Sequence, residues 1–151
     1  MFDPEGDSLT LAIIGAGVMG QGIAQIAVQA GVMVRLYDSF DGVAQRSHAA
    51  LTTTLGKLME RGRWTPAQAQ AAMARVSIAA SMHELADANG VVEATVEKLE
   101  AKQALFQQLE AIVATDTVLA TNTSSLSVTA IAAACAQPGW VGVFIFSTRF
   151  P

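Results

Sequence analysis

The sequence predicts an α/β fold in which helices cover both faces of a doubly wound, mainly parallel sheet, and three observations support it. Short apolar runs alternate with helical patterns along the whole chain, as in successive β-α-β units. The apolar fraction is 52% and the charged fraction only 15%, which suits a sheet buried on both faces. A glycine-rich turn joins the first predicted strand to the first predicted helix. With 151 residues and no visible linker or repeat, we expect one domain over 1–151.

The apolar runs give the predicted strands, and the spacing of apolar residues between them gives the helices. We expect strands over 9–14, 32–37, 76–78, 91–94, 117–120 and 140–146. We expect helices over 18–30, 41–61, 66–74, 98–113 and 128–134. Gly31 would end the first helix, Thr65 would cap the helix that begins at Pro66, and Ser127 would cap the last one.

The turn after the first strand has the G-x-G-x-x-G pattern and reads Gly15-Ala16-Gly17-Val18-Met19-Gly20. Gly15 would permit the tight turn, Gly17 the close approach of a pyrophosphate, and Gly20 the packing of the helix on the strand. The helix N-terminus offers free N–H groups and a partial positive charge to phosphates. The pattern predicts a Rossmann-type fold that binds a dinucleotide through residues 15–20. The alternative is a glycine-rich turn that merely connects the strand to the helix.

Asp38 follows the second predicted strand, where a Rossmann-type fold places an acid that binds the ribose of the cofactor. A carboxylate accepts hydrogen bonds from the 2′-hydroxyl, and it would repel a 2′-phosphate. The sequence therefore favours NAD over NADP.

Composition and charge exclude several other classes. The net charge is −4 without a basic cluster, so we expect neither nucleic acid nor an anionic membrane as a partner. The N-terminal residues are acidic, and no apolar run is long enough for a signal peptide or a membrane span. Cys135 is the only cysteine, which excludes an internal disulfide and indicates the cytoplasm. We expect Cys135 to be a packing residue, and we expect no metal site.

Five segments together resemble the NAD-binding domain of the 3-hydroxyacyl-CoA dehydrogenases, a group that includes 3-hydroxybutyryl-CoA dehydrogenases. They are IIGAGVMGQGIAQ at 13–25, LYD at 36–38, LADANGVVEATVE at 85–97, LEAKQALFQQLE at 99–110 and LATNTSSLSVTAIA at 119–132. The last two are more specific than the glycine pattern. The resemblance implies that Gly15, Gly17, Gly20 and Asp38 bind NAD, and that Glu97, Lys102 and Asn122 also belong to the cofactor site. From the residues alone, Glu97 and Lys102 would be an ordinary charge pair on a solvated helix end.

The resemblance also implies contacts with the substrate. Ser124 matches the family serine that hydrogen-bonds the 3-oxygen, although a serine after a strand is otherwise a loop or cap residue. Thr54 and Arg61 fall near family positions that touch coenzyme A, with Lys57 and Arg63 as further partners for its phosphates. The alternative for this region is a solvated basic turn between helices. His48 and His83 match no family site, and we expect them on the surface.

The end of the sequence departs from the family. Similar enzymes carry a catalytic histidine, which acts as the base, in a pattern close to V-A-G-L-H-F-F-N-P-V-P. Residues 141–151 read VGVFIFSTRFP, without histidine or asparagine. Loss of one base from a suitable coding string converts the family pattern into this tail. We therefore expect 142–151 to be a frameshifted tail, the family's helical substrate and dimerisation domain to be absent, and the chain to be inactive alone.

The leading hypothesis is that the intact enzyme oxidises (S)-3-hydroxyacyl-CoA to 3-oxoacyl-CoA with NAD, and that this chain is its cofactor-binding domain. A free-standing, non-catalytic NAD-binding module is the alternative. Another Rossmann-type hydroxyacid dehydrogenase would fit the cofactor motif but not TNTSSL. We also expect a homodimer through the apolar C-terminal strand, whose exposed residues would be Phe144, Ile145, Phe146 and Phe150.

Overall fold

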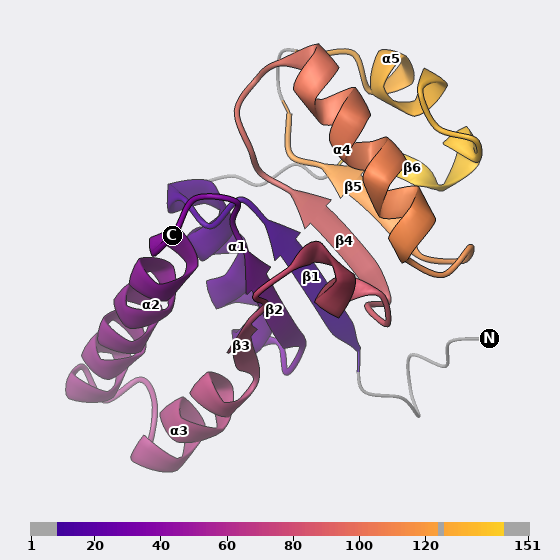
Figure 1. Cartoon of the computed structure of the whole chain (residues 1–151). Helices are drawn as coiled ribbons and strands as arrows, with labels where there is room; N and C mark the ends of the chain where they lie inside the picture. Colours follow the sequence, from indigo (N-terminus) through magenta and orange to yellow (C-terminus); the bar gives the residue numbers. More distant parts are fainter. Residues whose placement is uncertain (1–8, 124–125, 144–151) are drawn as a thin grey trace.

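The computed structural model describes residues 9–123 and 126–143, and these form one parallel sheet with helices on both faces (Figure 1). The strand order is β3-β2-β1-β4-β5-β6, and all neighbouring strands are parallel. The strands are β1 (Thr10–Ile14), β2 (Met33–Tyr37), β3 (Val76–Ile78), β4 (Gly90–Glu93), β5 (Val118–Thr121) and β6 (Val141–Val143). The predicted doubly wound fold is confirmed.

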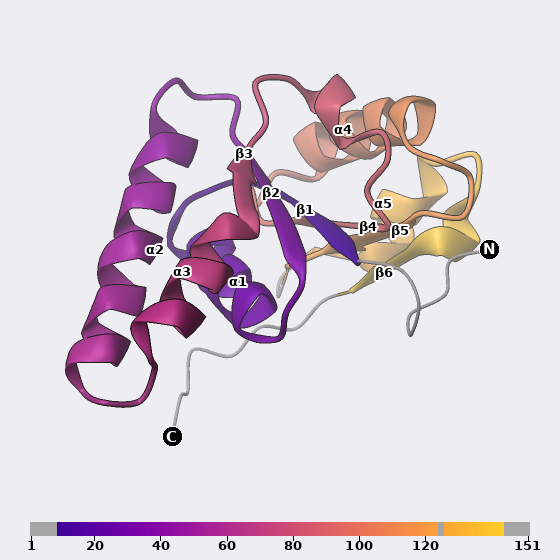
Figure 2. The ribbon, with the colours of Figure 1, turned by 90° about the horizontal axis from the view of Figure 1, so that it is seen from below.

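Helices cover the sheet from both sides, as Figure 2 shows for α2 and α3 on one side and α4 on the other. The helices are α1 (Val18–Gln29), α2 (Val43–Glu60), α3 (Pro66–Ala74), α4 (Leu99–Ile112) and α5 (Val128–Ala133), with short 3₁₀ helices η1 (Met82–Leu85) and η2 (Pro138–Trp140). Alternate residues of β1 enter separate cores. Ile13 packs with α1, α2 and α3, whereas Ala12 and Ile14 pack with α4 and α5. This two-sided burial explains why the strands read as continuous apolar runs.

Local backbone geometry accounts for two element ends that differ from the predictions. The N–H of Val32 donates to the carbonyl of Ala27 at 2.9 Å and closes the end of α1, so β2 starts one residue later than predicted. Gly31, with φ 87°, is the left-handed residue of that cap, as expected. Gly42 has φ 80° and lies before α2, which therefore starts at Val43 rather than at Asp41.

The C-terminal strand prediction was partly wrong. Trp140 belongs to η2, and the described strand covers Val141–Val143. Residues 144–146 lie outside the described residues. The predicted cap at Thr65 is confirmed, because its hydroxyl accepts the Gln68 N–H and the Gln68 side chain accepts the Thr65 N–H. The hydroxyl of Ser127 likewise accepts the N–H of Ala130.

The order in which strands are added to the sheet reverses between β1 and β4, although all the strands stay parallel. The chain moves outward from β1 to β2 and β3, then returns to place β4 on the other side of β1. Ile14 and Glu93, the last residues of β1 and β4, are paired in register. In open parallel sheets, ligands bind at the carboxyl ends of the strands on either side of such a switch point. Within the described ranges, no helix is long and apolar enough to cross a membrane.

Candidate functional site

Two of the three motif glycines are required by contacts within the protein. Gly15 has φ 94°, and a Cβ atom there would lie 2.4 Å from the carbonyl oxygen of Ala94. A Cβ atom on Gly20 would lie 1.8 Å from the carbonyl oxygen of Gly15. Gly17 is different, because a Cβ atom there would meet no described atom within 4 Å beyond its own two chain neighbours. The space above Gly17 is therefore available to a group that approaches from outside.

The N-terminus of α1 borders this space. Gly17 is the N-cap residue and has no side chain with which to satisfy the first N–H groups of the helix. The first turn carries no acidic side chain, and Val18 is 84% exposed. The uncompensated N–H groups and the helix dipole favour an anion at this end. The donor set therefore fits a phosphate group.

Asp38 is joined directly to the glycine turn. One carboxylate oxygen accepts the N–H of Ala16 at 2.9 Å, and the other accepts the N–H of Phe40 at 2.9 Å. The N–H of Gly15 donates to the carbonyl of Tyr37 at 2.9 Å. The sequence placed Asp38 near a ribose but did not predict these bonds. Each carboxylate oxygen still has a second lone pair for a ligand hydroxyl.

Apolar side chains are exposed around the same edge of the sheet. Val18 begins α1, Phe40 follows β2 and is 73% exposed, and Val96 follows β4 and is 63% exposed. Large apolar side chains that are exposed together often mark a binding surface. The edge thus combines backbone N–H groups, one carboxylate and apolar surface, which are the components that a nucleotide requires.

A buried ion pair joins β4 to α4 beside this edge. Glu93 and Lys102 have fully buried side chains, and the Nζ of Lys102 lies 2.8 and 2.7 Å from the two carboxylate oxygens of Glu93. Three further donors reach the same carboxylate, namely the hydroxyl of Thr121 at 2.6 Å and the N–H and hydroxyl of Thr95 at 2.6 and 2.5 Å. Such saturation offsets the cost of burying the two charges.

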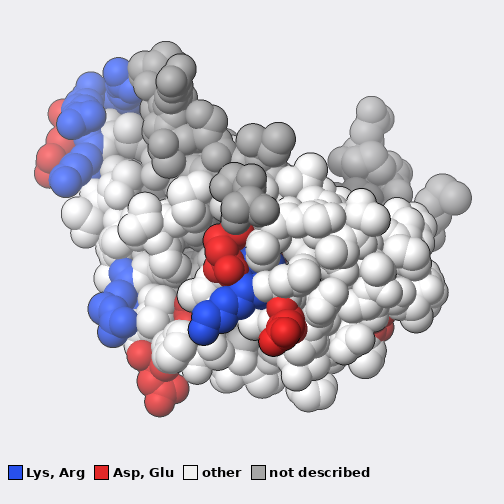
Figure 3. Space-filling view, turned by 90° about the horizontal axis from the view of Figure 1, so that it is seen from above, with Lys and Arg blue, Asp and Glu red and all other residues white. Residues whose placement is uncertain are grey.

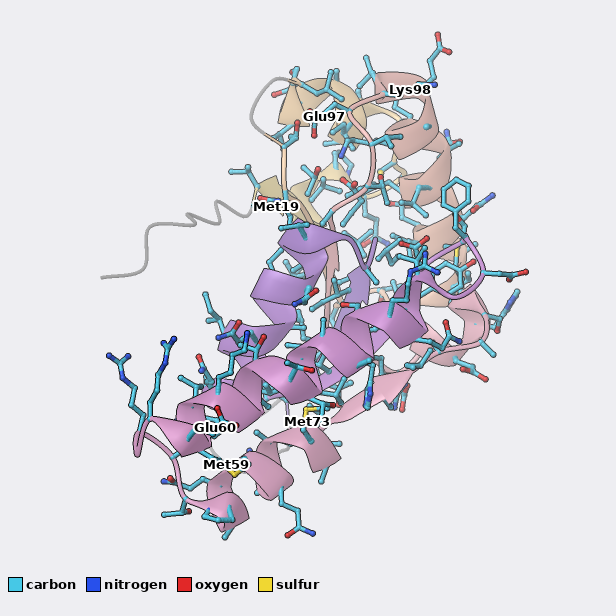
Figure 4. The ribbon with its side chains drawn as sticks, turned by 90° about the vertical axis from the view of Figure 1, so that its left-hand side faces the viewer. Met19, Met59, Glu60, Met73, Glu97 and Lys98 are labelled. Carbon is cyan, nitrogen blue, oxygen red and sulfur yellow. The ribbon has the colours of Figure 1, made fainter. Side chains whose placement is uncertain are left out.

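Glu97 continues this network toward the surface. One carboxylate oxygen lies 3.5 Å from the Nζ of Lys102, and the other accepts the hydroxyl of Thr123 at 2.6 Å. The side chain of Glu97 is 42% exposed, whereas that of Lys102 is not exposed at all. The interpretation of Glu97 and Lys102 as a pair on a solvated helix end is therefore wrong for Lys102. Figure 4 shows Glu97 and Met19, at the N-terminus of α1, toward the same end of the molecule.

Sequence reasoning missed Glu93, Thr95 and Thr121. A usable signal was present, because Lys102, Phe106 and Leu109 have the spacing of one helix face and all three are buried. A lysine in line with core residues requires a buried acid as its partner. Glu93, which ends an otherwise apolar strand, was the candidate.

The other predicted site residues have fewer described contacts with the glycine turn and the carboxyl edge of the sheet. The N–H of Asn122 donates to the carbonyl of Glu93 at 2.7 Å, so Asn122 lies at the carboxyl edge. Ser124 lies outside the described residues. Thr54 is in α2, where its hydroxyl donates to the carbonyl of Ala50 at 3.0 Å, and Arg61 follows the last residue of α2. Figure 4 shows Glu60 far from Met19 and Glu97, so the structure does not bring Arg61 to the glycine turn.

The remaining candidates have ordinary surroundings. Cys135 is buried and its thiol lies 3.8 Å from the carbonyl oxygen of Ile131, which suits a packing residue. Burial, followed by the charge of Glu110, raises the pKa of the Cys135 thiol and so disfavours a reactive thiolate.

His48 is half-buried in α2, and His83 is exposed in η1. The described residues contain no group of three or more His, Cys, Asp or Glu side chains that could hold a metal ion. The face in Figure 3 is largely uncharged.

Comparison with known proteins agrees with this geometry. Residues 10–148 match the family described as 3-hydroxyacyl-CoA dehydrogenase, NAD binding domain. A probable 3-hydroxybutyryl-CoA dehydrogenase of Deinococcus radiodurans is 39% identical over 86% of this chain and 46% of its own length. The 3-hydroxyadipyl-CoA dehydrogenase of Escherichia coli is 40% identical over 94% of this chain and 30% of its own length. The crystal structure of 3-hydroxybutyryl-CoA dehydrogenase from Escherichia coli superimposes with a TM-score of 0.91 and 38% identity, covering 94% of this chain and 30% of that one.

The sheet order, the glycine turn and the acid after β2 define a dinucleotide-binding domain of the Rossmann class. The chain belongs to the 3-hydroxyacyl-CoA dehydrogenase family, as its NAD-binding domain. It spans less than half the length of the relatives described above.

Proposed function

We propose that the intact protein oxidises (S)-3-hydroxyacyl-CoA to 3-oxoacyl-CoA with NAD, and that this chain holds the cofactor. The observation that carries the proposal is the open space above Gly17, between the uncapped N-terminus of α1 and the carboxylate of Asp38. A pyrophosphate fits the uncapped N-terminus of α1, and a ribose hydroxyl fits the carboxylate of Asp38. The relatives named above are dehydrogenases of acyl-CoA substrates, which supports the choice of reaction.

In this proposal, each part of the edge has one task. The N–H groups at the start of α1 neutralise the pyrophosphate, and Asp38 accepts the hydroxyls of the adenosine ribose. The exposed side chains of Val18, Phe40 and Val96 supply apolar surface for the flat rings. NAD, when bound, supplies the hydride acceptor. Ser124, two residues after Asn122, would hold the reacting oxygen of the substrate.

We propose that the coenzyme A moiety lies along α2. From Val43 to Arg61 the helix axis covers about 27 Å at 1.5 Å per residue, so only an extended ligand reaches from its far end to the carboxyl edge. Arg61 and Arg63 are exposed there, with Lys57 one turn earlier. Cationic side chains at a helix C-terminus suit the phosphates of an extended coenzyme.

Fluorescence titration of the purified chain with NADH tests the cofactor proposal. We expect saturable binding, with NADPH at least about tenfold weaker because Asp38 would repel its 2′-phosphate. An Asp38→Ala variant is the control, since it removes the carboxylate that would distinguish NADH from NADPH. Absence of saturable NADH binding, or equal binding of both nucleotides by the unaltered chain, would count against the proposal.

A non-catalytic NAD-binding module is the second candidate, and the C-terminal residues favour it. Residues 141–151 contain no histidine, so these residues offer no imidazole to take the proton of the 3-hydroxyl. We propose that 142–151 are read out of frame, in which case the intact gene encodes the dehydrogenase. Sequencing the locus separates the candidates. If one added base restores V-A-G-L-H-F-F-N-P-V-P and a further open frame, the result supports the dehydrogenase. A stop codon in the present frame, with no such continuation, supports the module.

We also propose a homodimer in the cytoplasm. β6 is an edge strand of the sheet, and Val143 at its end is 49% exposed. Among the described residues no strand pairs with its outer side, and an apolar edge of this kind favours association with a second copy. The single cysteine requires no oxidising compartment. Light scattering at increasing concentration tests the dimer, and a monomer throughout would exclude it.

A further inference from the structure

We propose that a cavity at the amino edge of the sheet binds a guanidinium group. The cavity has a volume of about 100 Å³ and lies between the end of α4, the start of β5 and residues 136–140. The glycine turn and Asp38 follow the carboxyl ends of β1 and β2, so the cavity lies at the opposite edge of the sheet from the proposed cofactor site (Figure 1). The inference therefore goes beyond the proposed function and does not depend on it.

Glu110 supplies a fixed carboxylate to this cavity. Its two oxygens accept the N–H groups of Ala136 and Gln137, both at 2.9 Å. Each oxygen retains a lone pair for a further donor. Within residues 9–123 and 126–143, Glu110 forms no ion pair with a Lys or Arg side chain. The cavity thus contains an acid that no cation of the described chain balances.

The end of α4 and an indole ring also favour a cation. Val113, the C-cap residue of α4, and Ala114 line the cavity, which therefore borders the negative end of the helix dipole. The last turn of α4 contains no basic side chain that would offset this negative end. Trp140 lines the cavity as well and is 44% exposed, and the face of an indole ring attracts cations.

The walls and the volume of the cavity select among cations. Val113 and Leu119 make part of the wall apolar, and an apolar wall does not replace the water around a strongly hydrated ammonium group. A guanidinium is planar and more weakly hydrated, donates to both oxygens of one carboxylate and stacks on an aromatic ring. Because a cavity of about 150 Å³ holds benzene, the smaller cavity here suits guanidinium, which has fewer heavy atoms.

Titration of the full chain with methylguanidinium and with methylurea tests the requirement for charge, because the two molecules have nearly the same shape and only the first is charged. In NMR spectra, the backbone N–H signals of Ala136 and Gln137 and the indole N–H signal of Trp140 report binding at the cavity. We expect saturable shifts of these signals with a dissociation constant of about 1–10 mM for methylguanidinium, as suits so small a ligand. Methylurea should bind at least about tenfold more weakly. Equal binding of both molecules, or no saturable shift with methylguanidinium, would overturn the inference.

Three variants assign the binding to particular side chains. Glu110→Gln removes the charge and should weaken methylguanidinium about tenfold or more. Trp140→Leu removes the ring and should weaken it about two- to fivefold; it leaves Glu110 unaltered, so it stays informative if Glu110→Gln does not fold. Asp116→Asn removes an equal charge from the exposed turn before β5 and should change the affinity less than about twofold. Equal weakening by Glu110→Gln and Asp116→Asn would overturn the inference by showing a general charge attraction, and so would unchanged binding in both Glu110→Gln and Trp140→Leu.

Arginine carries the guanidinium group both as a free amino acid and within a protein chain, and two compounds separate these sources. N-acetylarginine amide resembles an arginine within a chain, whereas free arginine adds a charged amino group and a carboxylate. Tighter binding of the amide would assign the cavity to an arginine side chain of a partner protein, and tighter binding of free arginine would assign it to a small molecule. Failure of both compounds to shift the signals of Ala136 and Gln137 would overturn the inference.

Discussion

A Cβ atom on Gly20 would lie 1.8 Å from the carbonyl oxygen of Gly15, so α1 can meet the turn only where position 20 has no side chain. The Gly20→Ala variant must therefore move the helix or the turn. We expect its free energy of unfolding to fall by about 3 kcal/mol or more, as for other forced backbone clashes. Urea denaturation measures the loss.

Gly17→Ala provides the matched comparison, because it adds the same methyl group in the same turn. The added methyl meets no described atom within 4 Å beyond its two chain neighbours, and we expect stability within about 1 kcal/mol of the unaltered chain. NADH affinity should fall about tenfold or more, since the methyl group occupies the space assigned to the pyrophosphate. A Gly20→Ala protein with unchanged stability would contradict the proposed backbone clash. Normal NADH binding by Gly17→Ala would contradict the placement of the pyrophosphate above Gly17.

Asp38 is expected to control the choice between the two nicotinamide cofactors. Asp38→Asn keeps the shape and an oxygen for the N–H of Ala16, but it removes the charge that repels a 2′-phosphate. The ratio of NADPH to NADH affinity should rise about tenfold or more. Asp41→Asn changes the same charge on a nearby exposed residue and should leave the ratio close to that of the unaltered chain. Equal shifts in both variants would show a general charge effect instead of a specific contact.

The sequence was sufficient for the fold because its information is local and repeated. Each parallel strand reads as a short apolar run, and helices end at residues such as Gly31 and begin at residues such as Thr65. The Glu93–Lys102 pair was different. It joins a strand end to a helix nine positions later, and charged residues near a helix start usually face solvent. Only the position of Lys102 on the buried face of α4 distinguishes a buried ion pair from a charged pair that faces solvent.

The bonds of Asp38 to the glycine turn were also missed, because a pattern of residue types contains no hydrogen-bond geometry. The motif located the acid and the turn near one ligand, and the structure adds that they contact each other directly. For the predicted coenzyme A residues, the sequence likewise gave positions along the chain but no distances in space. Thr54 and Arg61 were assigned by position in the sequence, and the length of α2 separates Arg61 from the carboxyl edge.

The buried hydroxyl of Ser47 predicts a stabilising substitution. Ser47 is 3% exposed on the inner face of α2, and its Oγ has no hydrogen-bond partner among the described residues. An unpaired buried polar group costs about 1–3 kcal/mol, so Ser47→Ala should raise the free energy of unfolding by about 1 kcal/mol. Thr53→Ala, on the exposed side of the same helix, is the comparison: it reports the gain from helix propensity together with the loss of the exposed hydrogen bond from its hydroxyl to the carbonyl of Ala49. A lower melting temperature for Ser47→Ala would show that the hydroxyl has a partner.

The Arg35–Asp87 ion pair predicts a small pH dependence of stability. Arg35 donates to both carboxylate oxygens of Asp87, and this hydrogen bonding, followed by the smaller effect of the Arg35 charge, lowers the pKa of Asp87. A carboxyl whose pKa is lower in the folded protein stabilises it above its ordinary pKa, and that contribution is lost as the pH falls through the lowered value. Because the side chain of Asp87 is 75% exposed, solvent screens the pair and the contribution at pH 7 should be below about 1 kcal/mol.

Asp87→Asn should therefore be slightly less stable than the unaltered chain at pH 7, and the difference should shrink progressively below about pH 4. Added salt should reduce it at pH 7, because the pair is exposed. Urea denaturation of both proteins at pH 7 and at pH 3 measures the effect, with Asp116→Asn, in the exposed turn before β5, as the control for a lost surface charge. A difference that is constant between the two pH values would show that Asp87 acts through something other than its ionised carboxylate.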